Sequence, residues 1–90
     1  MAWRIEFDAL AERELDRIDP QNARRILAFL HGRLARLEDP RSLGEALKGP
    51  KLDTFWKYRV GNYRIISRIE DGAVLILVVR IGNRKDVYRR

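Results

Sequence analysis

Two short turn signals divide the C-terminal half of the chain, and they constrain its fold more than any other feature. Gly61-Asn62 and Asp71-Gly72 are dipeptides typical of tight β-hairpins. They separate three segments with the composition of strands: residues 54–60, 63–70 and 73–81. Residues 74–79 are apolar without alternation, as expected for a central strand covered on both sides. The sequence therefore predicts three consecutive strands joined by hairpins.

A strand and two helices are predicted before these hairpins. Residues 3–7 alternate between apolar and polar side chains, which indicates a short strand. Asp8 suits the N-cap of a first helix, whose apolar positions share one face: Leu10, Ala11, Leu15 and Ile18. Asp19-Pro20 ends that helix and begins a second one, with Asp as N-cap and Pro at the first helical position. The second helix is expected to end near residues 38–40, because its apolar residues keep helical spacing up to there: Ala23, Ile26, Leu27, Leu30, Leu34 and Leu37.

The predicted fold is a single domain over residues 1–90, because a chain of this length supports one modest core. Residues 41–53 are expected to form a connecting loop that Leu43 and Leu47 attach to the core. The resulting order is β-α-α-β-β-β. It predicts an α+β fold in which an N-terminal strand and a helical hairpin pack on one face of a small antiparallel sheet.

The positive charge is concentrated in the second half of the chain. Residues 1–50 carry nine Lys/Arg and nine Asp/Glu, whereas residues 51–90 carry ten Lys/Arg and four Asp/Glu, which accounts for the whole net charge of +6. Such a distribution indicates a neutral scaffold with one cationic face, which attracts phosphate backbones or acidic proteins. The alternative is ordinary solubilising charge, and composition alone does not decide between them.

Composition also excludes several classes of protein. The chain has no cysteine, which excludes disulfides, a thiolate nucleophile and cysteine-ligated metals. No stretch has the length of apolar sequence that spans a bilayer, and the N-terminus lacks the apolar run of a signal peptide. We therefore expect a cytoplasmic protein without a membrane partner.

The register of the first hairpin gathers basic side chains on one face. A two-residue loop at Gly61-Asn62 makes Val60 and Tyr63 the closing pair, so that Arg59 lies opposite Arg64. Because side chains alternate, four basic residues share this face: Lys57, Arg59, Arg64 and Arg68. Like charges facing each other destabilise a sheet. The arginines therefore either splay into water or hold an anion, and both interpretations stay open.

The same register predicts apolar residues on both faces of the sheet. Ile66, Leu75, Leu77 and Val79 fall on the cationic face, while the opposite face is the better candidate for packing the helices. Two helices can cover only one face, so an apolar strip beside the cationic residues is a candidate protein interface. The alternative is that residues 41–53 fold over this strip.

Histidine and carboxylate chemistry is not favoured. His31, the only histidine, falls in the middle of the second predicted helix, and we expect it to be a surface or boundary residue. The acidic residues after position 50 lack the spacing of metal ligands. No metal or other cofactor is expected, and any catalysis would depend on Lys, Arg and Tyr.

The chain resembles the RelE branch of the RelE/ParE toxin superfamily over nearly its whole length, because the N-terminal strand and helical hairpin follow that family's layout and the C-terminal half carries its motifs. The most specific are Tyr63-Arg64 after the hairpin turn and the closing Gly82-x-Arg84-x-x-x-Tyr88. The others are Leu47-Lys48-Gly49, residues 56–60, residues 61–66 and residues 80–88. The resemblance implies the toxin of a bacterial type II toxin–antitoxin system, neutralised by a RelB-like antitoxin.

RelE-type members are metal-independent endoribonucleases, which enter the ribosomal A site, cleave the mRNA by attack of a 2′-hydroxyl and inhibit translation. Contact with promoter DNA is expected only through the antitoxin complex. Carried over residue by residue, the resemblance implies five catalytic residues: Lys57, Arg59, Arg64, Arg84 and Tyr88. Arg64 and Arg84 would hold and stabilise the phosphate. Lys57, which neighbouring cations push toward its neutral form, would act as general base, Arg59 would assist the leaving group or the phosphate, and Tyr88 would stack on a base.

Structural roles for some of these residues and other functions for the chain stay open. Lys57 would otherwise be a solvated strand lysine, Arg59 an edge charge and Tyr88 a cover for the end of the sheet. A ParE-like toxin, which inhibits DNA gyrase without catalysis, has the same fold, although Arg84 together with Tyr88 favours the ribonuclease. A third alternative is a binding module without activity.

Overall fold

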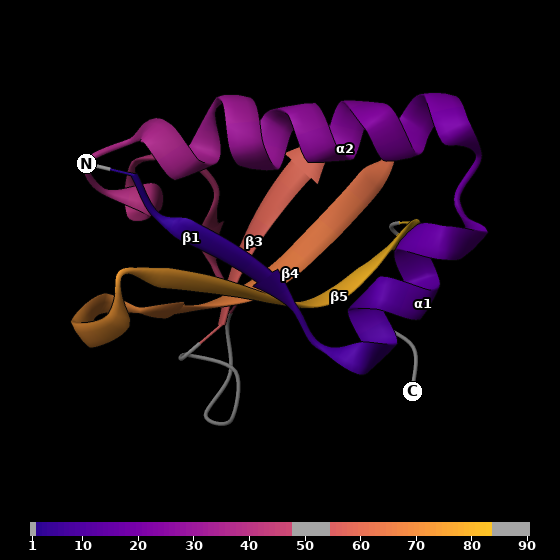
Figure 1. Cartoon of the computed structure of the whole chain (residues 1–90). Helices are drawn as coiled ribbons and strands as arrows, with labels where there is room; N and C mark the ends of the chain where they lie inside the picture. Colours follow the sequence, from indigo (N-terminus) through magenta and orange to yellow (C-terminus); the bar gives the residue numbers. More distant parts are fainter. Residues whose placement is uncertain (1, 48–54, 84–90) are drawn as a thin grey trace.

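The computed structural model describes residues 2–47 and 55–83 of the chain. In these ranges the elements follow the order β1 (Arg4–Phe7), α1 (Ala9–Arg17), α2 (Pro20–Gly32), β2 (Glu45–Ala46), β3 (Phe55–Val60), β4 (Tyr63–Glu70) and β5 (Leu75–Asn83). Three short 3-10 turns add to them: η1 (Leu34–Arg36), η2 (Pro40–Ser42) and η3 (Asp71–Ala73). Figure 1 shows the sheet with α2 across one face. The predicted α+β fold is confirmed.

The strands of the described ranges form one five-stranded mixed sheet in the order β1-β5-β4-β3-β2. The pairs β2–β3, β3–β4 and β4–β5 are antiparallel, as the hairpins predict. β1, however, runs parallel to β5, with Ile5 beside Ile76. The sheet is therefore not wholly antiparallel as expected. The alternation in residues 3–7 shows that a strand forms, but it carries no information on the direction of its partner.

Both helices begin where the sequence predicts. The Asp8 carboxylate accepts a hydrogen bond from the Ala11 amide (2.9 Å), and the Asp19 carboxylate accepts one from the Asn22 amide (3.1 Å). The hydrogen bonds from Asn22 lower the pKa of Asp19 below its usual range. Pro20 occupies the first turn of α2. Each cap satisfies a backbone donor that the helix itself leaves unpaired.

The second helix is shorter than predicted. α2 ends at Gly32, and the chain then forms the 3-10 turn η1 instead of continuing to residue 38. Leu34 is still buried in this turn, which explains why the apolar spacing continues. The carbonyl of Ala35 accepts the Trp3 amide (2.8 Å) ahead of β1. The Ala35 carbonyl therefore accepts a hydrogen bond from the segment before β1, and not from a further turn of the helix that the spacing predicted.

The two helices pack mainly against the sheet. α2 crosses one face of it, whereas α1 lies at the edge where β5 extends beyond β1 (Figure 1). The Asp8 amide donates to the Val78 carbonyl (3.0 Å), which joins the start of α1 to β5. The two helices therefore do not pack together on one face of the sheet as expected. α2 lies on the face, α1 lies at the edge, and a sharp turn connects them.

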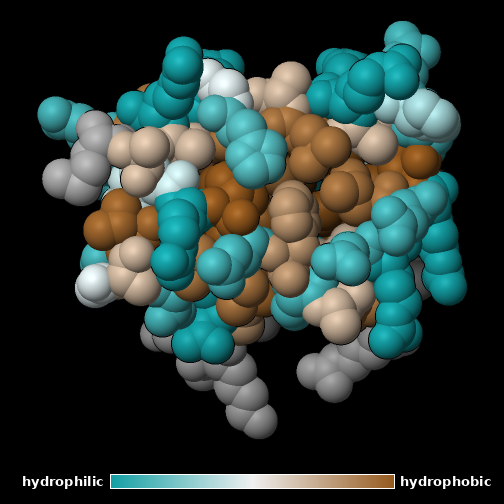
Figure 2. Space-filling model, in the orientation of Figure 1, coloured by the Kyte–Doolittle hydropathy of each residue, from teal (hydrophilic) through white to brown (hydrophobic). Residues whose placement is uncertain are grey.

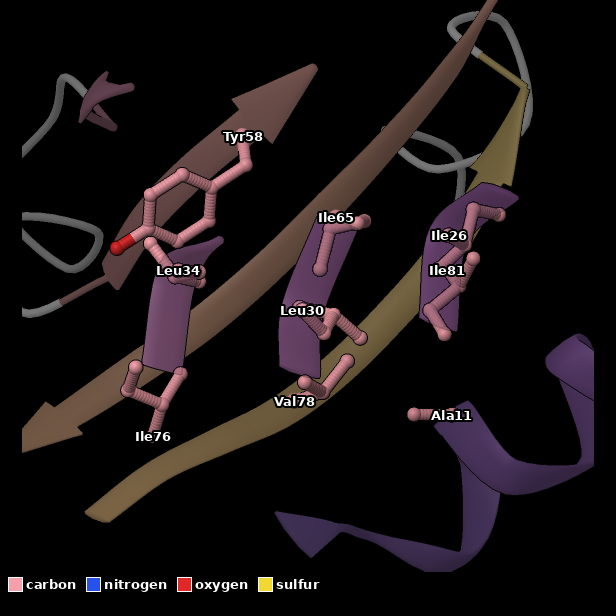
Figure 3. Packing of buried hydrophobic residues seen from close by; sticks show 9 residues of the cluster. All are labelled: Ala11, Ile26, Leu30, Leu34, Tyr58, Ile65, Ile76, Val78 and Ile81. Atoms are coloured by element: carbon pink, nitrogen blue, oxygen red, sulfur yellow. The ribbon is translucent and has the colours of Figure 1, made fainter. Parts of the chain in front are cut away.

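The core lies between α2 and the sheet. Figure 3 shows Leu30 of α2 beside Ile65 of β4 and Val78 of β5. The whole buried cluster consists of Ala11, Ile26, Leu30, Leu34, Tyr58, Ile65, Ile76, Val78 and Ile81. The Tyr58 hydroxyl donates to the Pro40 carbonyl (2.8 Å), and burial raises the pKa of Tyr58 above its usual range. This hydrogen bond ties η2 to β3.

The predicted loop contributes an edge strand. Residues 45 and 46 form β2, which pairs with β3 through Glu45–Lys57 and Ala46–Trp56. Leu43 packs against the core as predicted, and its carbonyl accepts the indole N–H of Trp56 (2.6 Å). The loop expected at 41–53 is therefore partly regular structure up to residue 47, and residues 48–53 lie outside the described residues.

The two turn signals have different outcomes. Gly61 has φ +59° while Asn62 has no positive φ, as in a type II′ turn, and the predicted two-residue hairpin is confirmed. The prediction of a two-residue hairpin at Asp71-Gly72 is wrong, because Glu70 pairs with Leu75 and the longer turn η3 connects the two strands. Arg41 holds this turn through a bidentate contact with Asp71 (3.0 and 2.8 Å). These hydrogen bonds lower the pKa of Asp71.

Candidate functional site

The candidate site lies on the sheet face opposite α2, here called the outer face. The predicted register is confirmed, since Val60 pairs with Tyr63 and Arg59 pairs with Arg64. Residues that alternate with the buried Tyr58, Ile65 and Ile81 point to the outer face. Lys57, Arg59 and Arg64 are therefore brought together there, as the sequence predicts.

Two rows of neighbouring positions organise the outer face near the hairpin. One row runs Arg59, Arg64, Gly82 across β3, β4 and β5, and the next runs Lys57, Ile66, Arg80. Directly opposed residues in antiparallel strands have Cβ atoms about 4.5–5.5 Å apart. We call Lys57, Arg59, Arg64 and Arg80 the basic patch. Lys57 and Arg80 are the cross-strand neighbours of Ile66, and Gly82 is the cross-strand neighbour of Arg64.

Arg80 was not predicted, because a β-bulge brings it to the outer face. The partners change from Ile66–Arg80 to Ser67–Val78, which leaves Val79 as an extra residue in β5. Regular alternation from Val78 would have placed Arg80 on the core face. Bulges of this kind redirect side chains and often lie next to functional sites. The apolar run 74–79 contains no glycine or other signal that would have revealed it.

The cations of the basic patch differ in their partners. Lys57 forms an ion pair with Glu45 of β2 (3.0 Å), and Arg80 forms one with Glu14 of α1 (3.1 Å). Arg59 is exposed and Arg64 half-buried, and neither has a carboxylate within ion-pair distance in the part of the chain that the structure describes. Within those residues Arg64 donates one long hydrogen bond, to the Tyr63 carbonyl (3.4 Å). Two arginines at paired positions, without a carboxylate partner among residues 2–47 and 55–83, form a surface suited to a phosphate.

The pairing of Lys57 bears on its chemistry. A carboxylate 3.0 Å away favours the charged ammonium. This effect opposes that of the neighbouring arginines, from which the sequence interpretation derived a neutral lysine. The balance of the two decides whether Lys57 accepts or donates a proton in a reaction.

Apolar residues continue the outer face beyond the basic patch. Ile66 is only 5% exposed although it lies outside the core cluster, and Leu75 and Leu77 are half-buried. Their neighbours in β1 are the ion-paired Arg4 and Glu6. The predicted apolar strip is therefore present, with a charged pair beside it in β1.

Two of the five predicted site residues, Arg84 and Tyr88, lie outside the described residues, as does the Lys48-Gly49 part of the resemblance. His31 is exposed on α2, as expected. Across residues 2–47 and 55–83, no group of three or more His, Cys, Asp or Glu side chains is arranged to hold a metal ion. No helix in those ranges has the length and apolar character needed to cross a membrane.

Comparison with known proteins gives one consistent family. Residues 5–88 match the family model described as the ParE toxin of the type II toxin–antitoxin system parDE. The toxin RelG of Mycobacterium tuberculosis is 31% identical over 90 residues, which is 100% of both chains. The toxin RelE of the same organism is 30% identical over 87 residues, covering 97% of this chain and 87% of the relative.

Solved structures agree on the fold. The toxin–antitoxin complex RelBE2 of Mycobacterium tuberculosis contains a chain with TM-score 0.83 and 26% identity, covering 96% of this chain and 95% of that one. The isolated RelE toxin of E. coli has TM-score 0.71 at 20% identity, covering 97% and 92% of the two chains. The family model covers residues 5–88, and the two relatives are 31% and 30% identical to this chain. The chain therefore belongs to the RelE/ParE superfamily of type II toxin–antitoxin toxins and is most similar to its RelE-type members.

Proposed function

We propose that this toxin is a metal-independent endoribonuclease that cleaves mRNA in the ribosomal A site and so inhibits translation. The observation that carries the proposal is the facing pair Arg59–Arg64, which has no carboxylate partner among the described residues and lies beside Lys57 on the outer face. Full-length relatives with the names RelG and RelE support the ribonuclease branch of the superfamily.

In the proposed reaction the 2′-oxygen of a ribose attacks the adjacent phosphorus. The 2′-hydroxyl loses its proton, the bond from phosphorus to the 5′-oxygen breaks, and that oxygen gains a proton. The products are a 2′,3′-cyclic phosphate and a free 5′-hydroxyl. The accumulating negative charge lies on the phosphate oxygens, where preorganised cationic donors stabilise the transition state most.

The proposed roles follow this charge distribution. Arg64 and Arg84 hold the phosphate, Arg59 assists the phosphate or the leaving oxygen, and Lys57 acts as general base. Tyr88 stacks on a base next to the cleaved bond. Because Glu45 favours the charged form of Lys57, the base role requires Lys57 to lose its proton in the presence of this carboxylate.

The experiment combines growth arrest with cleavage mapping. Wild-type toxin is expected to stop growth and to cut mRNA within A-site codons, mapped by primer extension on programmed ribosomes. Arg64→Ala and Arg84→Ala are each expected to abolish both effects. Arg4→Ala, which removes an ion-paired arginine at the far end of the outer face, serves as the matched control and should keep them. Full toxicity of both Arg64→Ala and Arg84→Ala would contradict the proposed site.

The second candidate function is non-enzymatic inhibition of DNA gyrase. Its support is the family model, whose description names the ParE toxin. A gyrase supercoiling assay run beside the mapping separates the two functions. Inhibited supercoiling without A-site cuts would favour the ParE-like function, and absence of both effects would indicate a binding module.

The proposed protein partner is a cognate RelB-like antitoxin. Solved complexes of RelB with RelE, such as the archaeal pair from Pyrococcus horikoshii, support it. The excess of positive charge after residue 50 would attract an acidic antitoxin segment, and Figure 2 shows an apolar region in the middle of the viewed face, bordered by hydrophilic residues. Promoter DNA would be bound only through this complex. A toxin of ribosomes acts in the cytoplasm, the location that the sequence predicts.

A further inference from the structure

Glu14 of α1 binds the end of β5 at the edge that β1 leaves open. β1 pairs with β5 only as far as Phe7–Val78, and α1 begins two residues later. The Glu14 carboxylate accepts the Ile81 amide (2.8 Å) and the Nε–H of Arg80 (3.1 Å to Oε2). Its Oε2 also lies 3.1 Å from Nη2 of Arg80. One carboxylate thus accepts a backbone N–H of β5 beyond the point where β1 ends and also fixes the neighbouring guanidinium.

This pair is more constrained than other arginine–carboxylate pairs of the outer face. The side chains of Arg80 and Glu14 are 29% and 19% exposed, and they are linked by several contacts. Arg4–Glu6 and Arg68–Glu70 are longer pairs, at 3.6 and 3.4 Å, between more exposed side chains. Exposed single-contact pairs hold their geometry weakly. The Arg80 guanidinium, in contrast, is held in place.

The bridge to Glu14 leaves one side of the guanidinium available. It occupies Nε and Nη2, while Nη1 makes no hydrogen bond with a residue of the described ranges. The bulge sets Arg80 opposite Ile66, in the row that ends at Lys57. An arginine carries donors on both edges of its planar group, so one edge can bind a carboxylate while the other binds a phosphate oxygen.

We propose that Arg80 is a further phosphate-binding residue of the basic patch and that Glu14 positions it. The ligand is a phosphodiester in the same RNA strand, adjacent to the phosphodiester that is cleaved. This inference rests on the proposed ribonuclease function. It adds a contact to the RNA backbone on the β5 side of Ile66, across the sheet from Lys57 on the β3 side.

The first test measures single-turnover cleavage on programmed ribosomes at several toxin and salt concentrations. Arg80→Met keeps the aliphatic stem and removes the charge. It is expected to raise the half-saturating toxin concentration about 5–10-fold, with the maximal rate changed less than about twofold, because phosphate binding of this kind is uniform. The slope of log affinity against log salt should fall by about 0.7, the value for one single-strand phosphate. Arg4→Ala, the matched control, should change neither quantity. A half-saturating concentration for Arg80→Met equal to that of Arg4→Ala would overturn the proposal.

The second test separates positioning from simple neutralisation. Glu14→Gln keeps an oxygen acceptor for the Ile81 amide and removes the negative charge. If Glu14 positions Arg80, this variant raises the half-saturating concentration, and adding it to Arg80→Met causes no further change. A lower half-saturating toxin concentration for Glu14→Gln than for wild type would mean that Glu14 only neutralises the charge of Arg80. This result would overturn the positioning role. Thermal unfolding midpoints of each variant show whether the change in affinity accompanies a loss of structure.

A third measurement distinguishes failure of this inference from failure of the proposed function. Binding of the free toxin to a 2′-O-methyl single-stranded RNA, which cannot be cleaved by 2′-hydroxyl attack, is followed by fluorescence anisotropy. If wild-type toxin makes no A-site cuts, the proposed function fails. The salt dependence of RNA binding by wild-type toxin and by Arg80→Met then still shows whether Arg80 binds a phosphate. If wild-type toxin cuts and Arg80→Met matches it in both assays, only the Arg80 inference fails.

Discussion

Gly44 leaves no room for a side chain, and it determines where β2 lies against β3. It has φ +71°, and an added Cβ would contact the backbone carbonyl of Lys57 and the ring of Tyr58. The same stretch holds Trp56 through the Leu43 carbonyl and presents Glu45 to Lys57. A single glycine thus controls the approach of the strand that carries the partner of the proposed general base.

Gly44→Ala is therefore expected to lower the free energy of unfolding by about 1–3 kcal/mol, from the left-handed backbone and the close contacts. Chemical denaturation measures this. Gly32→Ala is the matched control, since an added Cβ there meets nothing within 4 Å and φ is not positive. It should be neutral or stabilising. Equal effects of the two substitutions would contradict the role given to Gly44.

Tyr58 gives a second expectation at the scale of one residue. Tyr58→Phe keeps the ring that packs on Phe29 but leaves the Pro40 carbonyl without its buried donor. Losing this hydrogen bond should cost about 1–2 kcal/mol in the free energy of unfolding. Urea denaturation of the two proteins provides the comparison, and an unchanged midpoint would show that water replaces the hydroxyl at Pro40.

The ion pair between Glu45 and Lys57 bears on the base role proposed for Lys57. A general base must be neutral, and the carboxylate of Glu45 favours the charged ammonium. Glu45→Gln should therefore shift the rising limb of the cleavage pH–rate profile to lower pH. A shift to higher pH, or none, would show that Lys57 is not the base whose ionisation limits the rate.

At the scale of elements, the 3-10 turns η2 and η3 determine how the connection between β4 and β5 is held. η3 lengthens the connection between β4 and β5 and puts Val74 in the left-handed region (φ 50°), an uncommon conformation for a β-branched residue. The contact between Arg41 and Asp71 joins this turn to η2. The ends of the outer face are thus fixed by contacts between segments far apart in the sequence.

This link predicts a pH dependence of stability. Because Arg41 lowers the pKa of Asp71 in the folded state, Asp71 stabilises the fold above its unfolded pKa of about 3.9. That contribution is lost as the pH falls through the lowered folded value. Asp71→Asn should therefore reduce the drop in thermal midpoint between about pH 5 and pH 2. The effect is small, because both side chains are largely exposed to solvent. An unchanged drop would contradict the link.

At the scale of the whole molecule, the sequence predicted the fold class and the position of four basic residues on one face of the sheet: Lys57, Arg59, Arg64 and Arg68. Local chemistry determined these features: Asp8 and Asp19 cap helices wherever the chain folds, and Gly61-Asn62 fixes the register of Arg59 and Arg64. Arg80 could not be placed, because the bulge arises from how β5 meets both β4 and α1. The parallel direction of β1 and the end of α2 at Gly32 likewise depend on contacts with distant segments.

The fold places the excess positive charge of the C-terminal half on one face of the sheet. The basic half of the sequence forms β3, β4 and β5, and the outer face of these strands carries the basic patch. The acidic residues of the first half supply Glu14 and Glu45, which pair with two of its cations. Among residues 2–47 and 55–83, the cross-strand pair Arg59–Arg64 is the part of the patch without a carboxylate partner.

The most direct test of this account is the single-turnover rate of mRNA cleavage in the A site by wild-type, Arg64→Ala and Arg4→Ala toxin. Removing one preorganised donor to the transition-state phosphate should lower the maximal rate by about 10²–10³-fold in Arg64→Ala. Arg4→Ala should cleave at the wild-type rate. A maximal rate for Arg64→Ala within a few-fold of wild type would contradict a phosphate-cleaving site on the outer face of the sheet.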